Sequence, residues 1–264
     1  NDIGRRVNVE AAQELKRVTL ELGGKNAVMV LDDADLDLAV EGILWSAFGT
    51  TGQRCTACSR LIVQRGVRAE LEQRLMERAS RLRLGDGLDP DTQVGPLINA
   101  SQLERVHSYM DVARRDGART LLGGEPAREG ALAQGHFYRP TLLTDVTPQM
   151  RVGREEIFGP VLSIIAVESL EEAIAVNNDT RYGLSSAIFT RDINAANIAM
   201  RDVTTGILYI NAGTTGAEIQ LPFGGTRGTG NGHREAGLGA LEFFTEWKAI
   251  YVDYSGKLQR AQID

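Results

Sequence analysis

The sequence places one cysteine where it could act as a nucleophile. Gly52-Gln53-Arg54-Cys55 forms a polar turn directly after a stretch with helical apolar spacing. Cysteine attacks as a thiolate, and backbone amides or a cation such as Arg54 stabilise that anion. Because a free cysteine is more often an inert buried side chain, the position of Cys55 alone leaves both interpretations open.

A second cysteine, Cys58, gives the pair a C-x-x-C spacing. A redox pair of this kind is expected after a strand, and that context is missing here. A zinc site needs more ligands, and His107, His136 and His233 are far apart in the sequence. Redox and metal roles are therefore the weaker alternatives, and no metal is expected. Two cysteines in all predict a reducing, cytoplasmic location.

Two carboxylate motifs could assist such a nucleophile. Glu21 is flanked by leucines and followed by two glycines, so partial burial would raise its pKa and suit it to general-base chemistry. The alternative is a carboxylate paired with Lys25 or an arginine. The segment from Glu155 to Pro160 sets two carboxylates beside Phe158 and could hold a ribose, although a charged turn before a strand would look the same.

Helical and strand patterns alternate along the chain. Such alternation predicts an α/β fold with a largely parallel sheet and flanking helices. Residues 119–129 and the glycine-rich residues 212–240 are expected to be loops, and loops of the second length are usually functional. The expected helices are 2–13, 35–48, 67–82, 100–116, 170–178 and 193–203. The expected strands are 18–22, 27–31, 60–64, 138–146, 161–167, 185–190, 206–211 and 248–254.

Composition excludes two classes of partner. The formal net charge of -6 and the pI near 5.3 argue against a nucleic-acid-binding protein, which needs a basic surface. The longest apolar run, Val161–Val167, is far too short to cross a membrane. The chain does not begin with methionine, so we expect a processed chain or a piece of a longer one.

Taken together, the motifs resemble those of the aldehyde dehydrogenase superfamily, in the same order and over essentially the whole chain. A glutamate-containing Glu-Leu-Gly-Gly-Lys motif precedes a Gly-Gln-x-Cys motif, and two further motifs follow. Here these are Glu21–Lys25, Gly52–Cys55, Glu155–Pro160, and Pro222–Gly225 leading to Gly232–Glu235. The resemblance implies the superfamily's catalytic domain and oxidation of an aldehyde to a carboxylate with NAD or NADP.

The resemblance also implies a role for each matching residue. Cys55 would form a thiohemiacetal and then a thioester with the substrate, and Glu21 would activate the water that hydrolyses the thioester. The implied cofactor contacts are Leu22, Gly23, Glu156 and Phe158.

The loop from Asn211 to Ile219 and the ending Asp253-Tyr254-Ser255 resemble the antiquitin-like branch, which acts on α-aminoadipic semialdehyde. In that branch Arg54 would contact a substrate carboxylate, and the alternative is an Arg54 paired with a local acid. The implied substrate contacts are Arg54, Gly216, Ala217 and Phe223.

The same resemblance predicts how the chain is organised. Residues 1–22 would end an NAD-binding domain of Rossmann type, residues 23–244 would form the catalytic domain, and residues 245–264 an oligomerisation strand and tail. A homodimer or homotetramer is expected. The upstream residues that complete the cofactor site in the superfamily are not in this sequence. The alternative is therefore a catalytic-domain fragment that folds or oligomerises without binding the cofactor productively.

Overall fold

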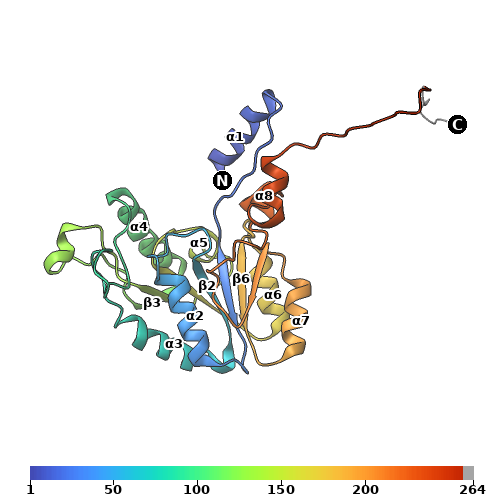
Figure 1. The fold of residues 1–264 in the computed structure, drawn as a ribbon. Helices are drawn as coiled ribbons and strands as arrows, with labels where there is room; N and C mark the ends of the chain where they lie inside the picture. The colour runs from blue at the N-terminus through green and yellow to red at the C-terminus, as the bar shows by residue number, and fades with distance from the viewer. Residues whose placement is uncertain (258–264) are drawn as a thin grey trace.

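The computed structural model describes residues 1–257, which form an α/β fold built on one seven-stranded sheet (Figure 1). The strand order is β3-β4-β5-β2-β1-β6-β7, and every neighbouring pair is parallel except the antiparallel pair of β3 and β4. The predicted fold class is confirmed. The strands are β1 Asn26–Val30, β2 Cys58–Gln64, β3 Arg119–Leu122, β4 Thr141–Thr144, β5 Val161–Val167, β6 Ser185–Phe189 and β7 Ile207–Ile210.

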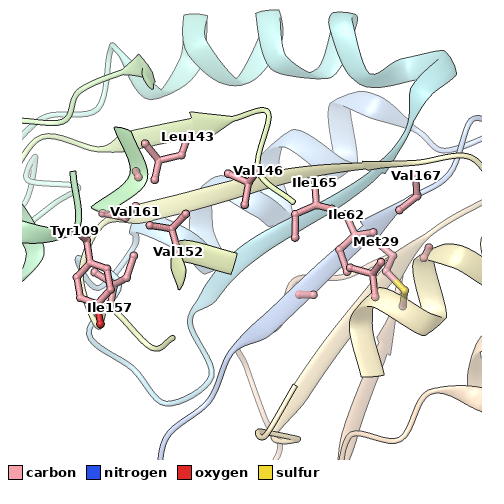
Figure 2. Packing of buried hydrophobic residues seen from close by; sticks show 14 of the residues in the cluster. Met29, Ile62, Tyr109, Leu143, Val146, Val152, Ile157, Val161, Ile165 and Val167 are labelled. Carbon is pink, nitrogen blue, oxygen red and sulfur yellow. The ribbon is translucent and has the colours of Figure 1, made fainter. Parts of the chain in front are cut away.

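Helices cover both faces of this sheet. The first face carries α2 Leu36–Phe48 and α3 Arg65–Ala79, and the second carries α4 Ala100–Asp116, α5 Arg151–Arg154, α6 Leu170–Asn178 and α7 Ile193–Asp202. Successive strand side chains point to opposite faces, so Ala27 and Met29 join one core while Val28 and Val30 join the other. Figure 2 shows the second-face core, where Met29, Ile62 and Ile165 meet. Burial on both faces explains why the central strands are continuous apolar runs.

Local signals in the sequence set the ends of the main helices. The Asp35 side chain accepts a hydrogen bond of 3.2 Å from the N–H of Leu38 and so caps the start of α2. Gly117, with a φ of 96°, ends α4 in the left-handed conformation that glycine adopts without strain. Both boundaries agree with the prediction.

Two predicted elements of the interior are corrected by the structure. Residues 18–22 do not form a strand. They run extended and pair only through an isolated bridge between Glu21 and Gly230, because they lie outside the sheet. Residues 119–122 were expected to lie in a loop and instead form β3, an edge strand beside β4. An edge strand needs one partner only, which explains its weak apolar pattern.

The C-terminal part is also corrected. The glycine-rich loop is shorter than predicted, because it contains the 3₁₀ turn η2 Arg227–Thr229 and ends at α8 Gly237–Phe244. Residues 248–254 are extended but form no strand in the single chain, since no neighbouring strand is available to them among the described residues. In Figure 1 they run away from the body of the molecule. The end of the predicted tail, residues 258–264, lies outside the described residues.

Two of the remaining helices lie beyond one end of the sheet. Figure 1 shows α1 Asp2–Gln13 next to α8 and away from the strands. The Arg17 guanidinium joins the two regions by donating to the Thr245 carbonyl at 3.0 Å, at the end of α8. A further short helical turn is η1 Gly130–Gln134. Among residues 1–257, every helix is too short or too polar to span a bilayer.

The sheet brings the sequence motifs together at one edge. The segment of Glu21 leads into β1, the turn of Cys55 leads into β2, and the segment of Glu156 leads into β5. These strands are parallel neighbours at the centre of the sheet, so their amino ends share one edge. The motifs therefore meet in space although they are far apart in the sequence.

Candidate active site

The turn that carries Cys55 connects α2 to β2 and is tightly held. Thr51 and Gly52 both have positive φ, and a Cβ added at Gly52 would lie 2.1 Å from the Gly159 carbonyl oxygen. Only glycine fits that approach. The turn is thereby pressed against the segment before β5, and Cys55 is left partly exposed at its end.

The two cysteines are in opposite environments. Both are free thiols, and Cys58 is buried at the start of β2 while Cys55 is not. Burial raises the pKa of Cys58 to about 12. Burial also raises the pKa of Cys55, but the backbone N–H groups of Thr56 and Cys55 oppose that rise, whereas the Glu21 charge adds to it. Within the described residues the pair forms no disulfide, and no cluster of three or more His, Cys, Asp or Glu could hold a metal ion.

Glu21 is a half-buried carboxyl close enough to Cys55 for its charge to affect that thiol. Its Oε2 is buried and has no hydrogen-bond partner among residues 1–257. Burial raises the pKa of Glu21 to about 7, the Glu235 charge adds to the rise, and Arg234 opposes it. A carboxyl with this pKa takes up and releases protons near neutral pH, as a general base must.

The glycine-rich loop packs directly on Glu21. Leu22 donates its N–H to the Thr229 carbonyl at 2.8 Å, and Thr229 Oγ1 donates to the Gly23 carbonyl at 2.8 Å. A Cβ at Gly224, which has a φ of 149°, would lie 2.8 Å from Glu21 Oε1. The Pro222–Gly225 motif therefore packs against Glu21, and the missing side chain at Gly224 leaves room for the carboxylate.

Glu156 lies where a polar group of a ligand could be bound. Its Oε1 accepts the Gly24 N–H at 2.9 Å, and its Oε2 makes no hydrogen bond within the described residues. A Cβ at Gly23 would lie 2.1 Å from Oε2, so this glycine gives the carboxylate its space. Burial raises the pKa of Glu156, while the Gly24 N–H and the charge of Lys25 oppose the rise. Phe158 lies two residues further and is 38% exposed, at a φ of 61°.

Side chains of α4 hold this strained segment in place. Gln102 Nε2 donates to the Ile157 carbonyl at 3.0 Å and to the Phe158 carbonyl at 2.8 Å. Arg105 Nη2 donates to the Glu156 carbonyl at 3.0 Å. Residues three apart on a helix share one face, so a single face of α4 binds three successive carbonyls. The positive φ of Phe158 is a strained backbone conformation for a residue other than glycine, and these hydrogen bonds stabilise it.

The predicted substrate residues do not share one pocket. Arg54 is exposed, has no carboxylate partner in the described part of the chain, and lines a small pocket with Glu156 and Phe158. Ala217 and Phe223 line a separate, largely apolar cleft of about 660 Å³ beside α8. Gly216 is exposed, at a φ of 109°.

Comparison with known proteins gives this arrangement its family. The model of the aldehyde dehydrogenase family matches residues 1–250. The chain belongs to the aldehyde dehydrogenase family. The family that the order of motifs resembled is therefore the family of this chain. In its structure, the segments of Cys55, Glu21 and Glu156 lie at one edge of the sheet.

Relatives within the aldehyde dehydrogenase family differ in substrate. The chain is 39% identical over 252 residues to an alpha-ketoglutaric semialdehyde dehydrogenase of Bacillus subtilis, covering 96% of this chain and 52% of that protein. It is 42% identical over 249 residues to a betaine aldehyde dehydrogenase of Rhizobium leguminosarum, covering 94% and 50%. The chain spans about half the length of the curated relatives that it matches. These matches do not single out the antiquitin-like branch.

Solved aldehyde dehydrogenase structures have the same fold. An NAD+ complex of betaine aldehyde dehydrogenase from Staphylococcus aureus aligns with a TM-score of 0.88 at 37% identity, covering 91% of this chain and 47% of that one. A putative aldehyde dehydrogenase from Burkholderia cenocepacia aligns with a TM-score of 0.94 at 39% identity, covering 98% and 53%.

The sequence motifs did not indicate some residues that shape this candidate site. Gln102 gave no sequence signal, because its contacts are to backbone atoms more than fifty residues away. Asn26 and Thr214 bind backbone atoms around Cys55, and a polar side chain at the start of a buried strand was the available sign for Asn26. The alternative in which Glu21 pairs with Lys25 is not observed, because Lys25 Nζ is buried without a hydrogen-bond partner in the described chain.

Proposed function

We propose that this chain carries the thiol and base chemistry of an NAD(P)+-dependent aldehyde dehydrogenase, with Cys55 as nucleophile and Glu21 as general base. The observation that carries the proposal is the half-buried Glu21, whose pKa of about 7 and unpartnered Oε2 accompany a partly exposed thiol. A structural carboxylate would be expected to have its oxygens hydrogen-bonded.

The proposed steps use the residues at this edge of the sheet. The Cys55 thiolate attacks the aldehyde carbon, and the developing oxyanion is stabilised by backbone N–H groups of the same turn. A nicotinamide cofactor held beside Glu156 and Phe158 would supply the hydride acceptor, and loss of hydride from that carbon would leave a thioester on Cys55. Glu21 then takes a proton from water, which attacks the thioester and releases the carboxylate product and the Cys55 thiol.

The residues around Glu156 fit a nicotinamide cofactor. The carboxylate is held by Gly24 through one oxygen and keeps the other free to accept from a ribose hydroxyl. Phe158 offers an exposed aromatic ring next to it. Residues 1–22 would belong to the cofactor domain and residues 23–244 to the catalytic domain, as the position of α1 outside the sheet supports. Leu22 and Gly23 would adjoin the cofactor.

For the substrate we propose an aldehyde that also carries a carboxylate. Arg54 immediately precedes the nucleophile, and its guanidinium has no carboxylate partner among residues 1–257. A free guanidinium favours a carboxylate ligand and disfavours a quaternary ammonium such as betaine aldehyde. α-Ketoglutaric semialdehyde and α-aminoadipic semialdehyde both meet this requirement. Because Ala217 and Phe223 line a separate cleft, we assign only Arg54 to the substrate carboxylate.

The C-terminal segment supports a proposed homodimer or homotetramer. Trp247 is 91% exposed and Tyr251 94% exposed, and Ile250 and Val252 beside Tyr251 are also exposed. An extended segment with unpaired backbone and apolar side chains can add to the edge of a partner's sheet. Residues 245–257 would then be buried between copies of the chain.

The test is a titration of the 264-residue chain with NAD+, followed by measurement of NADH formation with each semialdehyde, betaine aldehyde and propanal. Arg54→Gln should raise KM for the semialdehydes by roughly 10- to 100-fold, since hydrogen bonds between charged groups are lost. It should leave KM for propanal unchanged. A preference for betaine aldehyde would contradict the proposed substrate class. No NADH from any aldehyde, with Cys55 still reactive toward iodoacetamide, would favour a fragment that lacks a productive cofactor site.

A further inference from the structure

Side chains from outside the Cys55 turn bind its three successive carbonyl groups. Asn26 Nδ2 donates to the Cys55 carbonyl at 2.7 Å and to the Ala57 carbonyl at 2.9 Å. Thr214 Oγ1 donates to the Thr56 carbonyl at 2.7 Å. A connecting turn would ordinarily leave such carbonyls to water. Here the orientation of each peptide group is set by buried side chains.

Asn26 is itself fixed on every side. It is 3% exposed and begins β1, and its Oδ1 accepts the Ser185 N–H of β6 at 3.0 Å. A Cβ at Gly24 would lie 2.5 Å from the Cys55 carbonyl oxygen and 2.9 Å from Asn26 Oδ1. The carboxamide is thus clamped between two central strands and a close-packed glycine, and it cannot rotate to follow a moving turn.

Thr214 is fixed in the same way. It is fully buried, its N–H donates to Ser46 Oγ of α2 at 3.0 Å, and its carbonyl accepts from Ser185 Oγ at 2.9 Å. The loop that carries Gly216 and Ala217 is therefore tied to the turn that carries Cys55. Ser185 contacts both Asn26 and Thr214, so β6 supports the two clamps together.

Fixing these carbonyls also fixes N–H groups on the other side of the same peptide planes. The peptide unit is planar and trans, so the Cys55 carbonyl and the Thr56 N–H point in opposite directions. Binding the carbonyl to Asn26 turns the Thr56 N–H away from Asn26 and toward the thiol side. That N–H stabilises the thiolate and lowers the pKa of Cys55, against the effect of burial.

We infer that Asn26 and Thr214 are positioning residues for the thiol. Asn26 holds the Cys55–Thr56 peptide plane so that the Thr56 N–H faces the sulfur, and Thr214 holds the next plane, whose Ala57 N–H donates to the Arg54 carbonyl at 3.1 Å. The inference rests on the proposed role of Cys55 as nucleophile. Asn26, directly after the Glu21–Lys25 motif, would then assist formation of the Cys55 thiolate. The loop that carries Thr214 would help to hold the same turn.

The experiment measures the rate of Cys55 alkylation by iodoacetamide as a function of pH in the 264-residue chain. Mass spectrometry separates modification of Cys55 from that of Cys58. The variants are Asn26→Ala and Thr214→Val. The matched control is Asn177→Ala, which removes another fully buried carboxamide, one that accepts from Ser186 Oγ at 2.7 Å and has no contact with the turn.

We expect the midpoint of the rate profile to move up by about one pH unit in Asn26→Ala, as if a hydrogen bond to an anion were lost. Thr214→Val should move it less and in the same direction, and Asn177→Ala should not move it. A loss of stability alone would lower Tm without shifting the midpoint of the folded protein. The inference is overturned if folded Thr214→Val and Asn26→Ala both keep the wild-type midpoint.

Cys58 reports on folding in the same spectra, because a thiol buried in the core reacts only when the chain opens. If Asn26→Ala exposes Cys58, Thr214→Val alone decides the question. The inference and the proposed function fail separately. A shifted midpoint without any turnover of aldehyde or ester would support the positioning role and contradict the dehydrogenase.

Discussion

The Cys55 turn and the C-terminal segment after α8 differ in whether their backbone groups are hydrogen-bonded within the chain. The carbonyls of Cys55 and of the two residues after it are bound by Asn26 and Thr214. Residues 248–254 are extended and have no backbone partner within the described chain. The first region is organised by one chain alone, whereas the second exposes what a partner would cover. Substitution of a single buried residue should therefore change the reactivity of the Cys55 turn, whereas substitutions in the C-terminal segment should change the association of chains.

The largest effect should come from the nucleophile itself. Cys55→Ala should reduce release of p-nitrophenol from p-nitrophenyl acetate by at least about a thousandfold, since no thioester can form. The ester acylates the thiol without a hydride step, so the assay needs no cofactor. Cys58→Ala, which alters a buried core thiol, should keep the rate. Equal rates for both variants would show that the turn is not the reactive region.

The next effect is the pH dependence of thioester hydrolysis. The pKa of Glu21 is raised to about 7, and the carboxylate is the active form of the base. Hydrolysis should therefore increase about tenfold per pH unit below 7 and level off above it. The hydrolysis rate of the acetylated chain, measured between pH 5 and 9, tests this. A midpoint near the ordinary glutamate value would mean that Glu21 is solvated.

A third prediction concerns Lys25, which is 1% exposed next to the motif glycines. Burial lowers its pKa from 10.5 to about 7, and the Arg60 charge adds to the effect. The folded state thus disfavours the ammonium form, and stability from this group is lost as pH falls from 10.5 toward 7. Lys25→Met should raise the free energy of unfolding at pH 7 by about 1–3 kcal/mol.

The gain from Lys25→Met should shrink as pH rises toward 10.5, because the unfolded lysine then also loses its charge. Urea unfolding at pH 7 and pH 10 measures both values. A loss of stability at pH 7 would contradict the account, because it would mean that the buried ammonium has a stabilising partner.

The smallest effect on folding is expected at the C-terminal segment. Tyr251→Asp should change the free energy of unfolding by less than about 0.5 kcal/mol, because the side chain is exposed in the single chain. It should nevertheless abolish association, which sedimentation velocity measures. Leu88→Asp, at a loop residue that is 93% exposed, is the matched control and should leave association unchanged. Association that survives Tyr251→Asp would place the interface elsewhere.

The sequence predicted the elements whose signals are local. The bounds of α4 follow from its apolar spacing and from Gly117, and β5 agrees with the prediction residue for residue. Residues 18–22 have the apolar composition of a strand but lie where the sheet offers no place. Residues 248–254 carry a strand pattern without a partner in the same chain. Strand formation depends on a neighbour, which composition does not reveal.

The motifs nominated residues for the candidate site but did not indicate the contacts that support them. The family motifs named Cys55, Glu21 and Glu156 in advance, and the sheet places their segments at one edge. The contacts of Asn26 with Ser185 and of Thr214 with Thr56 join residues about 160 positions apart. No local pattern encodes such pairs, since they arise only when β1, β2 and β6 align. The sequence also gave no sign that Arg54 lies in a different pocket from Ala217 and Phe223.

The most direct test of the account follows the acyl group on Cys55. The 264-residue chain and its Glu21→Gln variant are mixed with p-nitrophenyl acetate, and intact mass is recorded over time. We predict that both chains are acetylated once at Cys55. The wild type should then lose the acetyl group at pH 8, and Glu21→Gln should retain it about 10²–10⁴ times longer, as expected for loss of a general base. Equal lifetimes of the thioester in the two chains would contradict the role of Glu21.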